Sequence, residues 1–152
     1  MTEEKLNWVE THRSLILPRD LDHLGHLNIA RYYEAITSAG MDLMGKVGLP
    51  GKEVARRRIG LVVLRLETDF MKEVHAGETI VIRSTFSKLG GKSLEARHQI
   101  YVADDEENPV ASCLVVGPMM DLNARKAVTI PDDLREKMAA LFHPEEKQRA
   151  GS

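Results

Sequence analysis

A broad apolar stripe between residues 28 and 47 most constrains what this chain can fold into. Asn28 suits the N-cap of a helix, Gly48 suits the residue after its end, and Pro50 prevents its continuation. The pattern predicts a helix of about five turns, and its apolar face must be covered. The apolar or small residues recur at steps of three and four, the period of one helix face: Ile29, Tyr32, Tyr33, Ile36, Gly40, Leu43 and Val47.

Much of the remaining chain alternates apolar and polar residues, which is typical of strands. Turn residues separate five such runs, which span residues 9–17, 59–72, 79–88, 93–102 and 109–121. Residues 131–142 follow, where Pro131 and two acidic residues suit the start of a short helix. The run 93–102 alternates most cleanly, and one face of it carries Leu94, Ala96, His98, Ile100 and Val102.

These elements predict an α+β fold. A curved antiparallel sheet of about five strands, wrapped around the long helix, is the simplest way to bury the apolar helix face. Consecutive strands joined by short turns favour a meander, and the short helix ends the fold. We expect one domain over residues 1–143, a disordered tail over residues 144–152, and a second copy of the chain at an exposed sheet edge.

Composition and charge exclude several classes of protein. The 152 residues carry a net charge of -2 and have a pI of about 6.3, whereas general nucleic-acid binders are usually clearly basic. The single cysteine, Cys113, permits no intrachain disulfide and no cysteine-based zinc site. The longest apolar run, residues 61–64, is far shorter than the ~20 residues that span a membrane. We therefore expect a cytoplasmic protein that binds neither nucleic acid nor membrane.

The densest chemistry lies in residues 19–28, directly before the predicted long helix. Two carboxylates, Asp20 and Asp22, and two imidazoles, His23 and His26, occur there around Gly25. The start of a helix offers unpaired N–H groups that can hold an oxyanion, and a nearby carboxylate can attack a carbonyl or activate a water. These are the ingredients of acyl transfer, although a polar loop with an N-cap would use the same residues.

The order of residues in this loop resembles the signature of the 4-hydroxybenzoyl-CoA thioesterase family, in which Asp-x-Asp-x-x-Gly-His-Val-Asn-Asn-x-x-Tyr leads into a long helix. Ile29 stands in place of the second asparagine, and residues 71–78, 92–98 and 130–131 resemble further segments of the family. The resemblance implies a hot-dog fold, a homodimer or homotetramer, and hydrolysis of an acyl-CoA. The matching positions are Asp20, Asp22, Gly25, His26, Asn28 and Tyr32.

The same resemblance implies roles for single residues. Asp22 corresponds to the family's nucleophile or general base, and the backbone N–H groups of Ile29 and Asn28 correspond to its oxyanion site. His26 orients Asp22 or a water, or only packs the loop, and Asn28 also suits a helix cap. Plant acyl-carrier-protein thioesterases carry an additional asparagine where this chain has Leu24, so their Asp-Asn-His arrangement is incomplete here.

Basic residues in two places are candidates for binding the phosphates of CoA. Arg57 and Arg58 belong to an arginine cluster, and guanidinium groups suit phosphate well. Lys92 follows a Gly-Gly turn at which the family often carries a basic residue. Tyr32 is the candidate for substrate contact near the helix start. Solvated loops would use the same basic residues.

No metal and no other cofactor is expected, because His23 and His26 lack a third ligand at a fixed spacing and the family needs none. Three alternatives to an acyl-CoA thioesterase remain: a thioesterase for acyl-carrier protein, a non-catalytic acyl-CoA-binding protein, and a dehydratase or hydratase of the same fold. Asp22 argues against pure binding, which needs no carboxylate beside the thioester. Glu34 on the long helix is the next candidate catalyst, because a related subgroup carries its carboxylate there.

Overall fold

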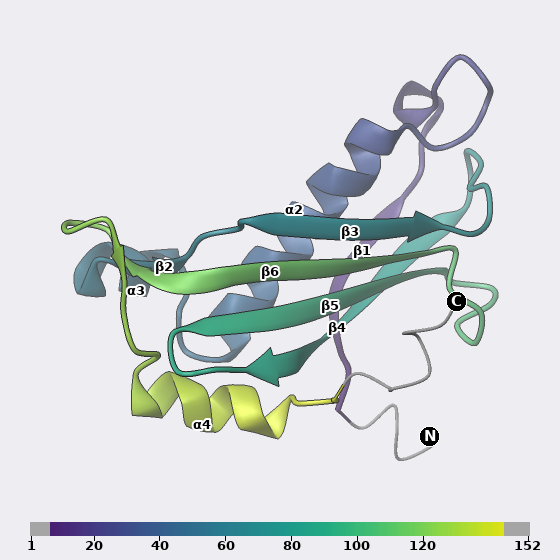
Figure 1. Cartoon of the computed structure of the whole chain (residues 1–152). Helices are drawn as coiled ribbons and strands as arrows, with labels where there is room; N and C mark the ends of the chain where they lie inside the picture. The colour runs from purple at the N-terminus through teal and green to yellow at the C-terminus, as the bar shows by residue number, and fades with distance from the viewer. Residues whose placement is uncertain (1–6, 145–152) are drawn as a thin grey trace.

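A computed structural model describes residues 7–144, and its long helix is partly enclosed by a curled sheet (Figure 1). This α+β arrangement confirms the predicted hot-dog architecture. The elements in chain order are β1 (Val9–Leu15), the 3-10 turn η1 (Pro18–Asp20), α2 (Ile29–Lys46), α3 (Gly51–Arg57), β2 (Ile59–Leu61), β3 (Arg65–Phe70), β4 (Thr79–Leu89), β5 (Ser93–Val102), β6 (Ala111–Asp121), β7 (Lys126–Ala127) and α4 (Asp132–Ala140).

Helix α2 forms where the Asn28 cap and the apolar stripe predict a helix. The Asn28 side chain accepts a hydrogen bond from Ala30 N–H at 2.9 Å and so caps the first turn. The predicted buried position of Ile29 is wrong, because 57% of this residue is exposed and the first turn extends past β3 (Figure 1). The buried face of α2 consists of Tyr32, Ala35, Ile36, Ala39 and Leu43.

The five long strands form one antiparallel sheet in the order β1-β4-β5-β6-β3. Strands β4, β5 and β6 form the predicted meander. Strand β3 does not join this meander through β4, as the sequence predicts, because β1 occupies the free edge of β4. It pairs with β6 instead, so β3 becomes an outer strand of the sheet on the side of α2 and the loop before it.

The predicted run 59–72 is divided into two strands. Strand β2 pairs with the end of β6 and strand β3 with its beginning, while residues 62–64 lie between the two. The backbone passes very close to Gly117 of β6, where an added Cβ would lie 1.7 Å from the Val62 carbonyl oxygen. No side chain fits in that space, so the break in this strand requires glycine at position 117.

The two shorter helices differ from the prediction. Helix α4 ends at Ala140, earlier than the predicted 142, and buries Leu134 and Met138 in the core. Helix α3 was not predicted, because its seven residues carry only one large apolar side chain, Val54. The predicted tail 144–152 lies outside the described residues, apart from Pro144.

Candidate active site

The loop between β1 and α2 folds back on itself in a tight turn, at the upper right of Figure 1. Asp22 N–H donates to the His26 carbonyl at 2.8 Å, and Gly25 N–H donates to the Asp22 carbonyl at 3.1 Å. Gly25 has a φ of 88°, a conformation that strains residues with a Cβ. Asn28 N–H donates to the Asp20 carbonyl at 2.9 Å and ties the turn to the start of α2. The glycine of the motif therefore shapes the backbone.

This turn fixes one oxygen of the Asp22 carboxylate. Asp22 Oδ1 accepts hydrogen bonds from Leu24 N–H at 2.9 Å and from His26 N–H at 3.3 Å. Its Oδ2 accepts no hydrogen bond from any residue between 7 and 144. Partial desolvation raises the pKa of Asp22, but the two N–H groups and the imidazoles of His26 and His23 outweigh it and hold the pKa below 3.8. The carboxylate is therefore ionised at neutral pH, with one oxygen available for chemistry.

The first turn of α2 contains one N–H group without a partner. Asn28 N–H is bonded to the Asp20 carbonyl, and Ala30 N–H is bonded to the Asn28 side chain. Arg31 N–H donates back to the Asn28 carbonyl at 2.9 Å. Ile29 N–H, by contrast, finds no acceptor among the described residues. The partial positive charge at a helix start adds to the attraction of this N–H for an anion.

The His26 side chain connects the loop to the segment after β3. His26 Nε2 lies 3.2 Å from Glu73 Oε1, and the imidazole packs edge-on against His75 with ring centroids 6.2 Å apart. No hydrogen bond joins this imidazole to the Asp22 carboxylate within residues 7–144. His26 thus contacts Asp22 through its backbone N–H, while its ring holds the neighbouring segment.

Asp22 and Ile29 line the same cavity, which has a volume of 290 Å³. Tyr32 and Phe70 form an edge-to-face pair in its wall, with ring centroids 5.0 Å apart. Burial, with a smaller effect of the Glu78 carboxylate, raises the pKa of Tyr32 to about 12, so its hydroxyl stays protonated and can donate a hydrogen bond. The remaining lining residues are His26, Leu27, Met71, Lys72, Glu73 and Val74.

The structure does not bring the other predicted substrate-binding residues to this cavity. Arg57 donates to Asp133 at 2.6 Å and to Glu53 at 3.1 Å, and so ties α3 to α4. Arg58 ends α3 in a left-handed conformation with φ of 53°, and its Nε donates to Asn123 at 3.1 Å. Lys92 lies exposed in the turn between β4 and β5. These three residues and the Asp22 cavity are found in different parts of the protomer.

Sequence reasoning missed the cavity wall that follows β3. Phe70, Lys72 and Glu73 line the cavity, although residues 71–78 stood out only as a segment that resembles the family. Their position depends on β3 lying at the sheet edge beside α2, which no local pattern indicates. Glu34, the alternative catalyst, is exposed and pairs with Arg31 at 2.9 Å, and it does not line the cavity.

Between residues 7 and 144, no group of three or more His, Cys, Asp or Glu side chains is arranged to hold a metal ion. In the same range, no helix is both long enough and apolar enough to cross a bilayer.

The fold and the loop at the start of α2 match a known family. A sequence model of the Thioesterase-like superfamily matches residues 16–138, which include the loop, α2 and the strands around it. This match and the site define a thioester hydrolase. The chain belongs to the Thioesterase-like superfamily.

Individual relatives are distant but cover most of the chain. The long-chain acyl-CoA thioesterase FadM of Escherichia coli is 28% identical over 125 residues, which are 80% of this chain and 90% of FadM. The chloroplastic acyl-acyl carrier protein thioesterase ATL3 of Arabidopsis thaliana is 23% identical over 139 residues, 90% of this chain and 72% of ATL3. The Staphylococcus aureus protein SAV2348, solved in complex with CoA, has the same fold with a TM-score of 0.82 at 15% identity, covering 95% of this chain and 94% of that one.

Proposed function

We propose that the chain hydrolyses acyl-CoA thioesters in the cytoplasm, at the cavity where α2 begins. The observation that carries the proposal is the pairing of one ionised carboxylate, Asp22, with one unpartnered N–H, that of Ile29, in the same 290 Å³ cavity. An oxyanion that forms on the thioester carbonyl needs such a donor, and its carbon needs a nucleophile or an activated water. We also propose that the chain is related to the 4-hydroxybenzoyl-CoA thioesterases within the superfamily.

The lowered pKa of Asp22 favours direct attack over base catalysis. A general base works best when its pKa lies near the operating pH, whereas the N–H groups of Leu24 and His26 hold the pKa of Asp22 below its ordinary value. We infer that Asp22 Oδ2 attacks the thioester carbon, Ile29 N–H holds the resulting oxyanion, and the CoA thiolate leaves. Water then cleaves the mixed anhydride, which releases the acid and restores the carboxylate. No metal or other cofactor takes part in this sequence.

Several features of the cavity suit a CoA ester. Lys72 lines the cavity and supplies a positive charge for phosphate, while Tyr32 supplies a protonated hydroxyl. FadM is named as a long-chain acyl-CoA thioesterase, and SAV2348 was solved in complex with CoA, so two similar proteins use this ligand class. ATL3 is named as an acyl-acyl carrier protein thioesterase, which makes acyl-carrier protein the second candidate substrate.

We infer that the chain forms a homodimer through β3. Among the described residues this strand pairs only with β6, so its other edge is open. Leu66 and Phe70 of β3 are exposed by 43% and 45%, and Leu64 directly before the strand by 73%, an apolar edge that a soluble monomer rarely presents. Phe70 also lines the Asp22 cavity, so a partner at this edge would complete the cavity wall. Sedimentation should give a mass of about twice 17.0 kDa or a multiple of it.

Thiol release from a panel of acyl-CoAs tests the proposed activity, with Asp22→Asn as the central variant. We expect kcat to fall by about 10²–10⁴-fold in a folded Asp22→Asn protein. Asp42→Asn is the matched control, because Asp42 is an exposed carboxylate on α2 that pairs with Lys46 and does not line the cavity. Full activity in Asp22→Asn would remove Asp22 from the chemistry. Turnover of acyl-carrier-protein esters alone would favour the second candidate, and binding without turnover would favour a non-catalytic binder.

A further inference from the structure

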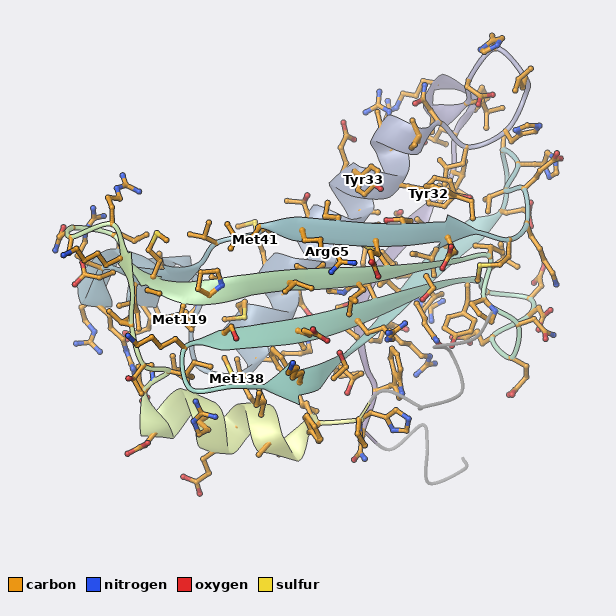
Figure 2. All side chains as sticks on the ribbon, in the orientation of Figure 1. Tyr32, Tyr33, Met41, Arg65, Met119 and Met138 are labelled. Atoms are coloured by element: carbon orange, nitrogen blue, oxygen red, sulfur yellow. The ribbon has the colours of Figure 1, made fainter. Side chains whose placement is uncertain are left out.

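A second, larger cavity of 620 Å³ lies between α2 and the sheet. It follows one side of α2 from Tyr33 to Met44, which corresponds to about 16 Å along the helix axis. Leu66 of β3 and Val115 of β6 line it from the sheet, and most of its other lining side chains are also apolar. Tyr33 and Met41, both labelled in Figure 2, lie close to β3 and line this cavity from α2. The volume falls within the range of small-molecule sites.

This cavity lies further along the same two elements, α2 and β3, that line the Asp22 cavity. Tyr32 and Phe70 line the smaller cavity, whereas Tyr33 and Leu66, one helix position and four strand positions away, line the larger one. The Tyr33 hydroxyl donates to Thr68 Oγ1 at 2.9 Å and so links α2 to β3, at a strand position between Leu66 and Phe70. An acyl group attached to a thioester at the start of α2 would pass this contact and follow the helix to reach the larger cavity.

One polar side chain faces this apolar space from the sheet. His98 on β5 lines the cavity although only 1% of the residue is exposed to solvent. Its Nδ1 lies 2.5 Å from Ser84 Oγ. Its Nε2, by contrast, has no hydrogen-bond partner among the described residues. Nε2 points toward α2, because a Cβ added at Gly40 would lie 4.0 Å from it.

The hydroxyl groups behind His98 determine which ring nitrogen carries the proton. The Thr11 hydroxyl lies 3.3 Å from the Ile82 carbonyl oxygen and 2.7 Å from Ser84 Oγ; when Thr11 donates to the carbonyl, the hydrogen between the two hydroxyls comes from Ser84. In that arrangement the Ser84 hydroxyl has no hydrogen left for His98, and Nδ1–H of His98 donates to it. Burial lowers the pKa of His98 to about 4, so the ring is neutral at pH 7. In this tautomer Nε2 is a hydrogen-bond acceptor that faces an apolar cavity.

The position of Gly40 shows how far His98 Nε2 lies from the proposed thioester site at Ile29. Gly40 lies eleven residues after Ile29, which is about 16 Å along the helix axis. An extended chain of single bonds advances about 1.2 Å per bond, so this distance corresponds to about thirteen bonds. A group that meets His98 Nε2 would thus lie far from the carbonyl, near the end of a long acyl chain and well beyond its third carbon.

We propose that the larger cavity binds an acyl chain whose far end carries a hydroxyl group, and that His98 Nε2 accepts the hydrogen bond of this hydroxyl. The length of the cavity requires a long aliphatic chain, and the bare acceptor requires a donor on it. A terminal methyl would leave Nε2 desolvated and unpaired, which disfavours the unsubstituted chain. The proposal rests on the proposed function only for the position of the carbonyl at the start of α2.

Three CoA esters of equal chain length test this proposal: tetradecanoyl-CoA, 3-hydroxytetradecanoyl-CoA and 14-hydroxytetradecanoyl-CoA. We expect kcat/KM for the 14-hydroxy ester to exceed that of the other two by about three- to tenfold, the value of one neutral hydrogen bond. Two variants should abolish this preference. Ser84→Ala/His98→Leu removes both polar partners together, and Gly40→Ala places a methyl group in front of Nε2 while improving the helix propensity of α2.

Calorimetric titration with the free acids, 14-hydroxytetradecanoic acid and tetradecanoic acid, separates this proposal from the proposed function. If no CoA ester is hydrolysed, the thioesterase proposal fails, yet tighter binding of the hydroxy acid by the wild type than by Gly40→Ala still supports the cavity site. Equal binding of the two acids, absence of binding, or a preference that survives in both variants would overturn the site. An equal gain for the 3-hydroxy ester would overturn its distal position.

Discussion

Replacement of Ile29 by proline would remove the proposed oxyanion donor and little else. Ile29 is the first residue of α2, the helix position at which proline is best tolerated. Its N–H has no partner among the described residues, so proline breaks no hydrogen bond of the fold. The preceding residue, Asn28, has φ of -68° and ψ of 139°, which is the conformation that a following proline favours. The backbone is thus already shaped for the substitution.

The expected loss follows from the count of donors at this site. The neighbouring Asn28 and Ala30 N–H groups are both occupied, so Ile29 N–H is the one donor of the first turn that can reach an oxyanion within the described protomer. Removal of one oxyanion donor costs about 10²–10³ in kcat, or about 2.7–4 kcal/mol. The stability of Ile29→Pro should stay close to that of the wild type, because the helix loses no hydrogen bond.

The assay is thiol release from the best acyl-CoA, with Ile29→Pro compared against Ile29→Ala. Both variants lose the isoleucine side chain, but only the proline variant loses the N–H, so the ratio of their kcat values reports the donor alone. Thermal unfolding of both proteins confirms that the helix start is intact. A proline variant that is folded and as active as the alanine variant would refute the role of this N–H and place the oxyanion elsewhere.

Three further predictions test the site and the fold. Burial lowers the pKa of His98 from 6.5 to about 4, so between these pH values the unfolded chain binds more protons than the folded protein. The free energy of unfolding should therefore fall by about 2 kcal/mol from pH 7 to pH 5. Denaturant titrations should show a smaller decrease in the Ser84→Ala/His98→Leu variant. Lys72→Gln should raise KM for CoA esters severalfold, because Lys72 lines the cavity. Arg57→Gln should leave KM unchanged, because Asp133 and Glu53 already pair with Arg57. A higher KM in Arg57→Gln would instead support the predicted contact between Arg57 and a CoA phosphate. Gly117→Ala should prevent stable folding because its Cβ would overlap the Val62 carbonyl, while Gly91→Ala, which meets open space, should unfold like the wild type.

Local sequence patterns were sufficient to locate most of the helices and strands, but not to predict which strands pair. The step of three and four residues located α2 to within one residue at each end, because its caps and its buried face are local features. Alternation located β4, β5 and β6 and their meander for the same reason. The pairing of β3 with β6 is a contact between distant segments, and nothing in residues 65–70 indicates which strand they join. The break at residues 62–64 likewise depends on Gly117, far along the chain.

The residues of the candidate site likewise divide into those that local sequence patterns predict and those that distant contacts bring into place. Asp22 and Ile29 could be predicted because the loop and the start of α2 adjoin in sequence, and the structure places both in one cavity. Lys72 and Glu73 could not, since they reach that cavity only through the placement of β3. The ion pairs of Arg57 with Glu53 and with Asp133 of α4 could not be predicted either, and its phosphate contact stays a prediction.

His98 shows why a polar residue on an apolar strand face is ambiguous until its neighbours are known. The alternation of residues 93–102 places His98 among apolar residues, a position that fits a satisfied core histidine as well as a ligand contact. Pairing of β4 with β5 and β1 brings Ser84 and Thr11, 73 residues apart in sequence, behind the ring and occupies Nδ1. The glycine at position 40 keeps the opposite side of the ring open toward α2. A histidine kept only for packing would gain from a side chain in that space, so the open side argues for a ligand.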